Sequence, residues 1–214
     1  MPNEKLATAR QNILRNCNLI VDIGANDGDW ISKVRKDGYK GNAVCIEPLK
    51  SNFHRLKTRQ IPRTICLNYA IGEKNGMIQI NQASNNGLSS SILELNDYHL
   101  KAAPYVKIID RQNVEMIKLS RLLQKYTKRK IYIKIDVQGY ELQVLKSMQK
   151  SNFQNVYAFE VETNLVSTYK NASLIEETIK FLRLNGYKPL RIENGFSMPN
   201  FGQLLQADIL FVKS

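Results

Sequence analysis

The feature that most constrains the fold is a repeated change from short apolar runs to segments with helical spacing. Apolar runs at 19–24, 42–48 and 64–72 are separated by helix-like segments at 27–38 and 51–60. Short continuous runs of this kind are typical of strands that are buried on both faces. Strands that alternate with helices at this spacing predict parallel strands joined by right-handed crossovers, which is a doubly wound α/β sheet.

The second half of the chain extends this pattern and then departs from it. Further core strands and helices are expected, in order, at 131–136, 140–149, 155–162 and 173–186. Two last strands, 187–193 and 207–214, have a connection that is short for a helical crossover, so we expect them to pair antiparallel. The prediction is a mostly parallel seven-stranded sheet with its last strand antiparallel, in a three-layer αβα sandwich.

Between the third and fourth core strands the sequence changes character. Residues 76–83 alternate like a strand, 84–91 are small and polar, and 114–130 are expected to form a short strand and then a helix. The polar segment is either a lid or a surface loop. We expect residues 1–18 to form an N-terminal helix or arm, and 19–214 to form a single domain, since this length suits one core.

Composition excludes several classes of protein. A hydrophobic content of 43% is in the globular range, and no apolar run is long enough to predict a transmembrane helix. The N-terminus lacks the pattern of a signal peptide. The three cysteines, Cys17, Cys45 and Cys66, are scattered and odd in number. This usage favours a reducing, cytoplasmic location without disulfides.

The chain is strongly basic, with 31 Lys and Arg against 19 Asp and Glu and a net charge of +12. Much of the excess lies in residues 31–65 and 101–130. Such a surface attracts anionic partners, among them nucleic acid, acidic glycans, phosphate-linked substrates and membrane surfaces. A solvated basic face without a specific partner is equally consistent with these charges.

The stretch "VDIGANDGDW" ends a strand in glycine and begins a helix within a few residues. Gly24 allows a ligand to approach the backbone closely. The dinucleotide pattern G-x-G-x-x-G is not met, because Asn26 and Asp29 occupy its second and third glycine positions. With Asp22 and Asp27 the loop is acidic, so it would repel a pyrophosphate and attract the sulfonium and amino groups of S-adenosylmethionine.

Residues at the ends of the second and third strands complete a nucleoside site. Glu47 ends the second strand, where a carboxylate can accept hydrogen bonds from both ribose hydroxyls. The alternative is an ordinary acid at a strand end. Asn68, Tyr69 and Ala70 end the third strand and would line an adenine slot, although the same residues also suit core packing.

Six stretches together resemble the FkbM family of S-adenosylmethionine-dependent methyltransferases: "VDIGANDGDW", "CIEP", "NYAIG", "GLSSSI", "IKIDVQGYELQVLK" and "ADILFV". The resemblance runs from about residue 19 to the C-terminus. It implies a seven-stranded, Rossmann-like class I fold and methyl transfer, usually to a hydroxyl of a sugar, glycan or secondary metabolite. It also implies that Asp22, Gly24 and Asn26 shape the methionine end of the cofactor site, that Glu47 holds the ribose, and that Asp136 lies beside the methionine moiety and the reacting centre.

Methyl transfer to a sugar hydroxyl calls for a general base or a metal ion, because the hydroxyl is a weak nucleophile near neutral pH. Asp136 ends one core strand, and Glu160 and Glu162 lie near the end of the next. In one interpretation Asp136 or Glu160 takes the proton. In the other, Asp136 and Glu162 hold Mg²⁺ or another divalent cation. His99, which follows the polar loop, is a further candidate base.

These observations predict an O-methyltransferase that uses S-adenosylmethionine to modify a sugar hydroxyl of a glycan or glycoconjugate. Methylation of a secondary-metabolite hydroxyl is an alternative. A second alternative, prompted by the basic surface, is methylation of RNA. A third is a non-catalytic module that binds glycan through the same basic face. Nucleic acid is disfavoured because the basic segments carry no aromatic-rich stripe for stacking bases.

Overall fold

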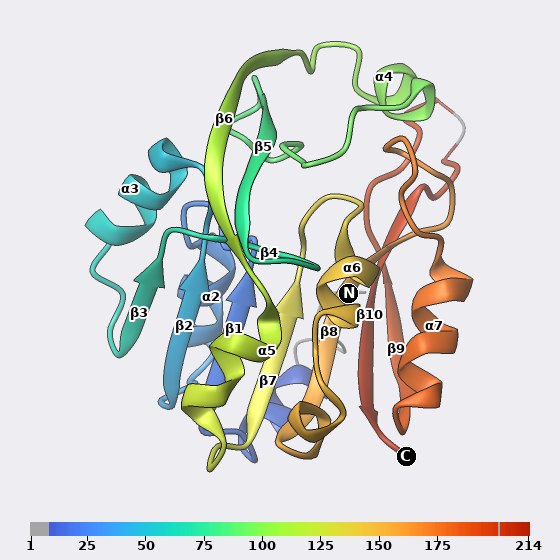
Figure 1. Ribbon diagram of the computed structural model, residues 1–214. Coiled ribbons are helices and arrows are strands. Elements are labelled where there is room, and N and C mark those ends of the chain that lie inside the picture. The colour runs from blue at the N-terminus through green and yellow to red at the C-terminus, as the bar shows by residue number, and fades with distance from the viewer. Residues whose placement is uncertain (1–8, 201) are drawn as a thin grey trace.

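The computed structural model describes residues 9–200 and 202–214, which form a central seven-stranded sheet and a small three-stranded sheet above it (Figure 1). The strand order of the central sheet is β3-β2-β1-β7-β8-β10-β9. β10 runs antiparallel to both of its neighbours, whereas the other neighbouring pairs are parallel. The predicted sheet, including the antiparallel pairing of the last two strands, is confirmed.

The central strands are β1 (Leu19–Ile23), β2 (Asn42–Ile46), β3 (Thr64–Leu67), β7 (Ile131–Ile135), β8 (Val156–Asn164), β9 (Tyr187–Asn194) and β10 (Gln206–Lys213). The small sheet contains β4 (Ala70–Ile71), β5 (Gly76–Ala83) and β6 (Ile108–Ile117), in the order β4-β6-β5. The α-helices are α2 (Asp29–Lys36), α3 (Lys50–Thr58), α4 (Asp97–Ala102), α5 (Leu119–Leu123), α6 (Glu141–Lys146) and α7 (Ile175–Leu184). Two short 3₁₀ helices are η1 (Gln124–Tyr126) and η2 (Lys150–Gln154).

Helices cover both faces of the central sheet, as expected for a doubly wound fold (Figure 1). One core cluster joins the sheet to α5, α6 and α7. A second cluster joins the opposite face to α2, to α3 and to residues 9–14, which are helical. β1 and β7 are buried along their whole length, which explains why both read as continuous apolar runs.

The segment expected as a single third strand is divided between the two sheets. β3 ends at Leu67, and β4 begins at Ala70 and pairs with β6 instead. Between them the side-chain amide of Asn68 donates to the backbone carbonyls of Glu47 and Pro48, at 2.9 and 2.8 Å. These bonds replace the strand ladder and turn the chain out of the central sheet.

The region 108–126 also differs from the expected short strand and helix. β6 is ten residues long and begins well before the expected position. Its first half is largely exposed, so its pairing depends on the ladder with β5 rather than on an apolar pattern. The helix that follows is brief, because α5 gives way to the 3₁₀ turn η1.

Three further expectations concern the whole chain. Of the predicted N-terminal helix or arm, residues 1–8 lie outside the described residues, and 9–14 are helical. No helix in the described ranges combines the length and apolar character needed to cross a membrane. All three cysteines are free. The interpretation of 19–214 as a single domain stays a prediction.

Candidate active site

A cavity of about 370 Å³ lies at the edge of the central sheet where β1, β2 and β7 end. β8 supplies a further wall, and the polar segment 84–91 lines the cavity from the side of the small sheet. Most of the predicted site residues line it, namely Gly24, Asn26, Glu47, Tyr69, Ala70, His99, Asp136 and Glu162. Asp22, Asn68 and Glu160 are not among its lining residues.

Gly24 permits a close approach of backbone from β7. Its φ angle is +83°, and a Cβ atom there would lie 1.8 Å from the carbonyl oxygen of Asp136. The backbone N–H groups of Gly24 and Ala25 both donate to the carbonyl oxygen of Ile46, at 3.0 Å. The predicted glycine turn is therefore also the point where the ends of β1, β2 and β7 are tied together.

Asp22 lies beneath this turn, on β1. Burial raises the pKa of its carboxyl to about 7, although the charge of Lys134 opposes the shift. Its two carboxylate oxygens accept no hydrogen bond from the residues that the structure describes. Asp22 does not line the cavity, and its part in cofactor binding stays a prediction.

Glu47 is almost fully buried, at 5% exposure, and both of its carboxylate oxygens face backbone donors. Oε2 accepts from the N–H of Asn26 and Oε1 from the N–H of Leu49, each at 2.9 Å. Burial raises the pKa of Glu47 to about 7, and these hydrogen bonds oppose the shift. Each oxygen keeps a second lone pair, so the carboxylate fits a pair of ribose hydroxyls.

Asp136 is held by two side-chain donors. Lys134 Nζ donates to Oδ2 and Gln138 Nε2 to Oδ1, each at 2.8 Å. Burial acts to raise the pKa of Asp136, but Lys134 and the hydrogen bonds outweigh it, so the pKa is lowered. The carboxylate is therefore ionised at neutral pH, which suits the positive groups of S-adenosylmethionine.

The turn after Asp136 is fixed from below by Glu141. Gln138 and Gly139 both have positive φ angles, of 58° and 97°. Glu141 Oε1 accepts from the backbone N–H groups of Val137 and Gly139, at 3.1 and 3.0 Å. These bonds satisfy donors that the strained turn would otherwise leave unpaired. In this conformation of the turn, Gln138 lines the cavity.

Gln138 connects most of the polar groups around this end of the cavity. Its Nε2 binds Asp136 and also donates to Glu162 Oε2 at 2.9 Å. Its Oε1 accepts from the hydroxyl of Tyr169 at 2.6 Å, and its backbone carbonyl accepts from Ser91 Oγ at 2.7 Å. Gln138 and Tyr169 are not among the residues predicted from the sequence. The only available signal was a polar residue inside the strand-to-helix turn "VQG".

His99 lies on α4 and is 2% exposed. Its ring packs between Tyr169 and Phe196, with centroids 5.3 and 5.2 Å away. Neither ring nitrogen has a hydrogen-bond partner among the described residues. Burial lowers the pKa of His99, so the imidazole is neutral at neutral pH. A neutral, unpaired imidazole in the cavity wall can accept a proton.

Glu160 was expected at the tip of its strand, but β8 continues to Asn164 and leaves it further inside the sheet. Its carboxylate forms two hydrogen bonds of 2.6 Å with Arg10. It also accepts from Trp30 Nε1 at 3.2 Å and from the hydroxyl of Tyr132. It does not line the cavity, so this geometry does not support Glu160 as the group that takes the acceptor's proton.

The expected metal site at Asp136 and Glu162 is likewise not supported. Within 9–200 and 202–214, no group of three or more His, Cys, Asp or Glu is arranged to hold a metal ion. Asp136 accepts an N–H donor on each of its oxygens and Glu162 accepts two on Oε2, so both carboxylates already serve as hydrogen-bond acceptors.

The comparisons with known proteins identify the family. Residues 22–189 match the model of the methyltransferase FkbM domain, which is well over half of the chain. The chain belongs to the FkbM methyltransferase family. It is a methyltransferase that depends on S-adenosylmethionine. No curated protein matches this FkbM protein in sequence.

Solved structures show that this FkbM protein has the class I methyltransferase fold. Sp1610 of Streptococcus pneumoniae, a putative tRNA (m1A22) methyltransferase in complex with S-adenosyl-L-methionine, has a TM-score of 0.55 at 7% identity, with 98% of this chain and 72% of that chain covered. The methyltransferase domain of bacterial CtHen1-C has a TM-score of 0.52 at 12% identity, with 100% of both covered. The N-terminal domain of EvdMO1, crystallised in the presence of SAH and D-fucose, has a TM-score of 0.52 at 8% identity, with 100% and 82% covered.

Proposed function

We propose that this FkbM protein transfers the methyl group of S-adenosylmethionine to a sugar hydroxyl of a glycan or glycoconjugate. The observation that carries the proposal is the chemistry of the cavity wall. The described part of the chain contributes to it three acids, a neutral imidazole and several amides and hydroxyls, but no Lys or Arg. Such a wall suits a cationic cofactor and an uncharged acceptor that is rich in hydroxyls.

The cofactor end of the cavity follows from the strand ends. Gly24 and Asn26 would bound the methionine portion, and Glu47 would accept from the ribose hydroxyls. Tyr69 and Ala70, which line the cavity after β3, would contact the adenine. When it is bound, S-adenosylmethionine supplies a methyl group that is already activated on sulfonium, so the protein's task is binding, alignment and exclusion of water.

We assign the acceptor's proton to His99. The hydroxyl must lose its proton as its oxygen becomes bonded to the methyl carbon, and His99 is buried, neutral and unpaired among the described residues. Asp136 is a weaker base, because its lowered pKa favours the ionised form. Its role in the proposal is to hold the positive end of the cofactor.

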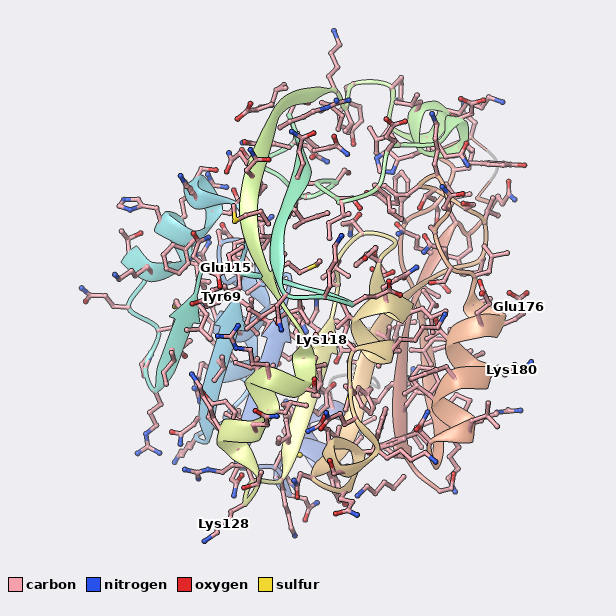
Figure 2. The ribbon with its side chains drawn as sticks, in the orientation of Figure 1. Tyr69, Glu115, Lys118, Lys128, Glu176 and Lys180 are labelled. Carbon is pink, nitrogen blue, oxygen red and sulfur yellow. The ribbon has the colours of Figure 1, made fainter. Side chains whose placement is uncertain are left out.

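RNA is a second candidate acceptor, prompted by the basic surface, but the cavity supports RNA less well than a sugar. Lys128 and Lys180, for example, project away from the central sheet (Figure 2). Among the described residues, no Lys or Arg lines the cavity. An RNA acceptor would bring phosphates close to its reactive hydroxyl, where Asp136, whose lowered pKa keeps it ionised, would repel them. The basic residues instead suit an anionic portion of a glycoconjugate outside the cavity, or a peripheral anionic surface.

The test is methyl transfer from radiolabelled S-adenosylmethionine to a panel of methyl glycosides, small phenols and alcohols, and unmodified RNA. We expect incorporation into a glycoside, and unchanged turnover when EDTA removes divalent ions. Incorporation into RNA alone, or into phenols alone, would contradict the sugar assignment.

The variant His99→Phe tests the base, because the phenyl ring keeps the packing against Tyr169 and Phe196. It should lower kcat by roughly 10²- to 10⁴-fold, the usual range for loss of a general base. Its affinity for S-adenosylhomocysteine should be unchanged. His54→Phe, on the exposed face of α3, is the matched control and should leave kcat unaffected.

A further inference from the structure

Glu162 differs from the other acids of the cavity in how its oxygens are used. Two glutamine amides donate to the same oxygen, Oε2: Gln138 Nε2 at 2.9 Å and Gln206 Nε2 at 3.0 Å. Glu162 lines the cavity, and its other oxygen, Oε1, accepts no hydrogen bond from the described part of the chain. The bonds on Oε2 leave Oε1 as the oxygen available to a ligand.

The two glutamines are themselves held in one orientation. Gln138 Oε1 accepts from the hydroxyl of Tyr169, so its Nε2 must face the carboxylates. Gln206 Nε2 also donates to Asn164 Oδ1 at 3.2 Å. Reversing either amide would place its oxygen against carboxylate or carbonyl-type oxygens. The clamp on Glu162 is thus fixed by its own hydrogen-bond network.

The other two acids of the cavity wall have no comparable free oxygen. Asp136 uses one oxygen for Lys134 and the other for Gln138. Glu47 uses both oxygens for backbone N–H groups near the ribose position. Glu162 shares Gln138 with Asp136, so it lies next to the carboxylate that faces the methionine end of the cofactor site.

We propose that Glu162 Oε1 accepts a hydrogen bond from the sugar hydroxyl next to the reacting one, beside the position of the transferred methyl group, and that Gln138 and Gln206 are positioning residues which aim it there. The reacting hydroxyl then keeps its own O–H for His99, and the two contacts together orient its oxygen toward the methyl carbon. The proposal rests on the proposed function, because it deepens the description of the same site.

The test needs no acceptor. Sinefungin is an S-adenosylmethionine analogue that carries a primary amine in place of the transferable methyl group, so its amine reaches into the acceptor position. Calorimetric titrations compare its Kd with that of S-adenosylhomocysteine, which has no group there. Burial and the charge of Asp136 raise the pKa of Glu162 well above its usual range, and the cationic amine of sinefungin favours the ionised form. We expect the wild-type protein to bind sinefungin about tenfold more tightly, the lower end for a charge-assisted hydrogen bond, because ionising Glu162 offsets part of the gain.

Glu162→Gln is the decisive variant. Its amide oxygen can still accept from Gln138 and Gln206, which would turn the amide N–H₂ toward the cavity and replace an acceptor by a donor. The ratio of the Kd for S-adenosylhomocysteine to that for sinefungin should fall to about one, because the charge-assisted hydrogen bond is lost. The affinity for S-adenosylhomocysteine should stay within about threefold of the wild type. Gln138→Met, which removes the clamp, should reduce the preference partly.

Glu47→Gln is the matched control inside the same cavity. It should weaken both ligands equally and leave their ratio unchanged, because Glu47 lies at the ribose position. A wild-type ratio near unity, or a ratio that Glu162→Gln does not alter, would overturn the proposal. If neither ligand binds the wild-type protein, the cofactor assignment itself fails, and this outcome is distinct from failure at Glu162.

Discussion

At the scale of single residues, Gly24 is the position with the least freedom. Gly24→Ala would place a methyl group 1.8 Å from the carbonyl oxygen of Asp136, in a backbone conformation with φ of +83°. The ends of β1 and β7 would have to separate. We expect the variant to lose about 3 kcal/mol or more of unfolding free energy and to bind no S-adenosylhomocysteine. Urea unfolding and calorimetry measure the two effects.

The suitable control for that variant is Gly38→Ala, since Gly38 also has a positive φ, of 100°, but its Cβ would meet no atom within 4 Å. It carries the conformational strain without the collision. Equal losses in the two variants would show that strain alone, and not the approach of Asp136, makes Gly24 necessary.

Glu47 should make cofactor binding depend on pH. Burial raises its pKa to about 7 in the free protein, whereas ribose hydroxyls that donate to it favour the ionised form and lower that pKa. Binding therefore releases a proton below neutral pH, and affinity must rise with pH. We expect the affinity for S-adenosylhomocysteine to increase roughly tenfold between about pH 5.5 and about pH 7.5. Glu47→Gln should bind weakly and flatten this dependence, and a flat wild-type profile would contradict the ribose assignment.

The residues of the site differ in how far the sequence could reveal them. Gly24, Glu47 and Asp136 could be predicted because each stands where an apolar strand ends, and parallel strands bring such ends to one edge. Tyr169 and Gln206 could not, because each reaches the site through a side-chain hydrogen bond from a distant part of the chain. No local spacing encodes such a contact.

At the scale of elements, the segment 84–91 is linked to the reaction centre through hydrogen bonds. The Tyr169 hydroxyl lies 2.6 Å from Gln138 Oε1 and 3.3 Å from the carbonyl oxygen of Ser89. Tyr169→Phe would remove the single O–H that these two oxygens share, at a cost of about 1–3 kcal/mol. Amide exchange in 84–91 should become about three- to tenfold faster in the complex with S-adenosylhomocysteine, as hydrogen–deuterium exchange would show.

Tyr98→Phe is the matched control for that experiment. Tyr98 is half-exposed on α4, and no hydrogen bond joins its hydroxyl to the described residues. Its exchange rates should match the wild type. Unaltered exchange in Tyr169→Phe would mean that the segment is held in place by packing and not through Gln138.

Elements with a buried face were predictable, and those shaped by polar contacts were not. The runs that became β1, β2 and β7 are apolar because helices cover both of their faces. At the break between β3 and β4, the side-chain amide of Asn68 donates to two carbonyls of the loop that follows β2. Strand propensity in "TICLNYAIG" continues through this point, so the turn is decided by tertiary contacts.

At the scale of the whole molecule, the N-terminal helical segment is fixed to the sheet by a buried ion pair. Arg10 donates twice to Glu160, whose carboxylate also binds Trp30 on α2 and Tyr132 on β7. This contact joins parts of the chain 150 residues apart. A buried pair of this kind is costly to break from one side, because the remaining charge stays desolvated.

The Arg10–Glu160 ion pair should affect the unfolding free energy but not kcat, and both quantities can be measured. Arg10→Met should lower the unfolding free energy by about 3–5 kcal/mol, because Glu160 would be left as an unpaired buried charge. Adding Glu160→Gln should recover part of this loss, as a double-mutant cycle in urea would show. Since Glu160 lies outside the cavity, Glu160→Gln alone should keep its affinity for S-adenosylhomocysteine and its kcat within about twofold, at a temperature where it is folded. A large fall in kcat with cofactor affinity intact would instead restore Glu160 as the group that takes the acceptor's proton.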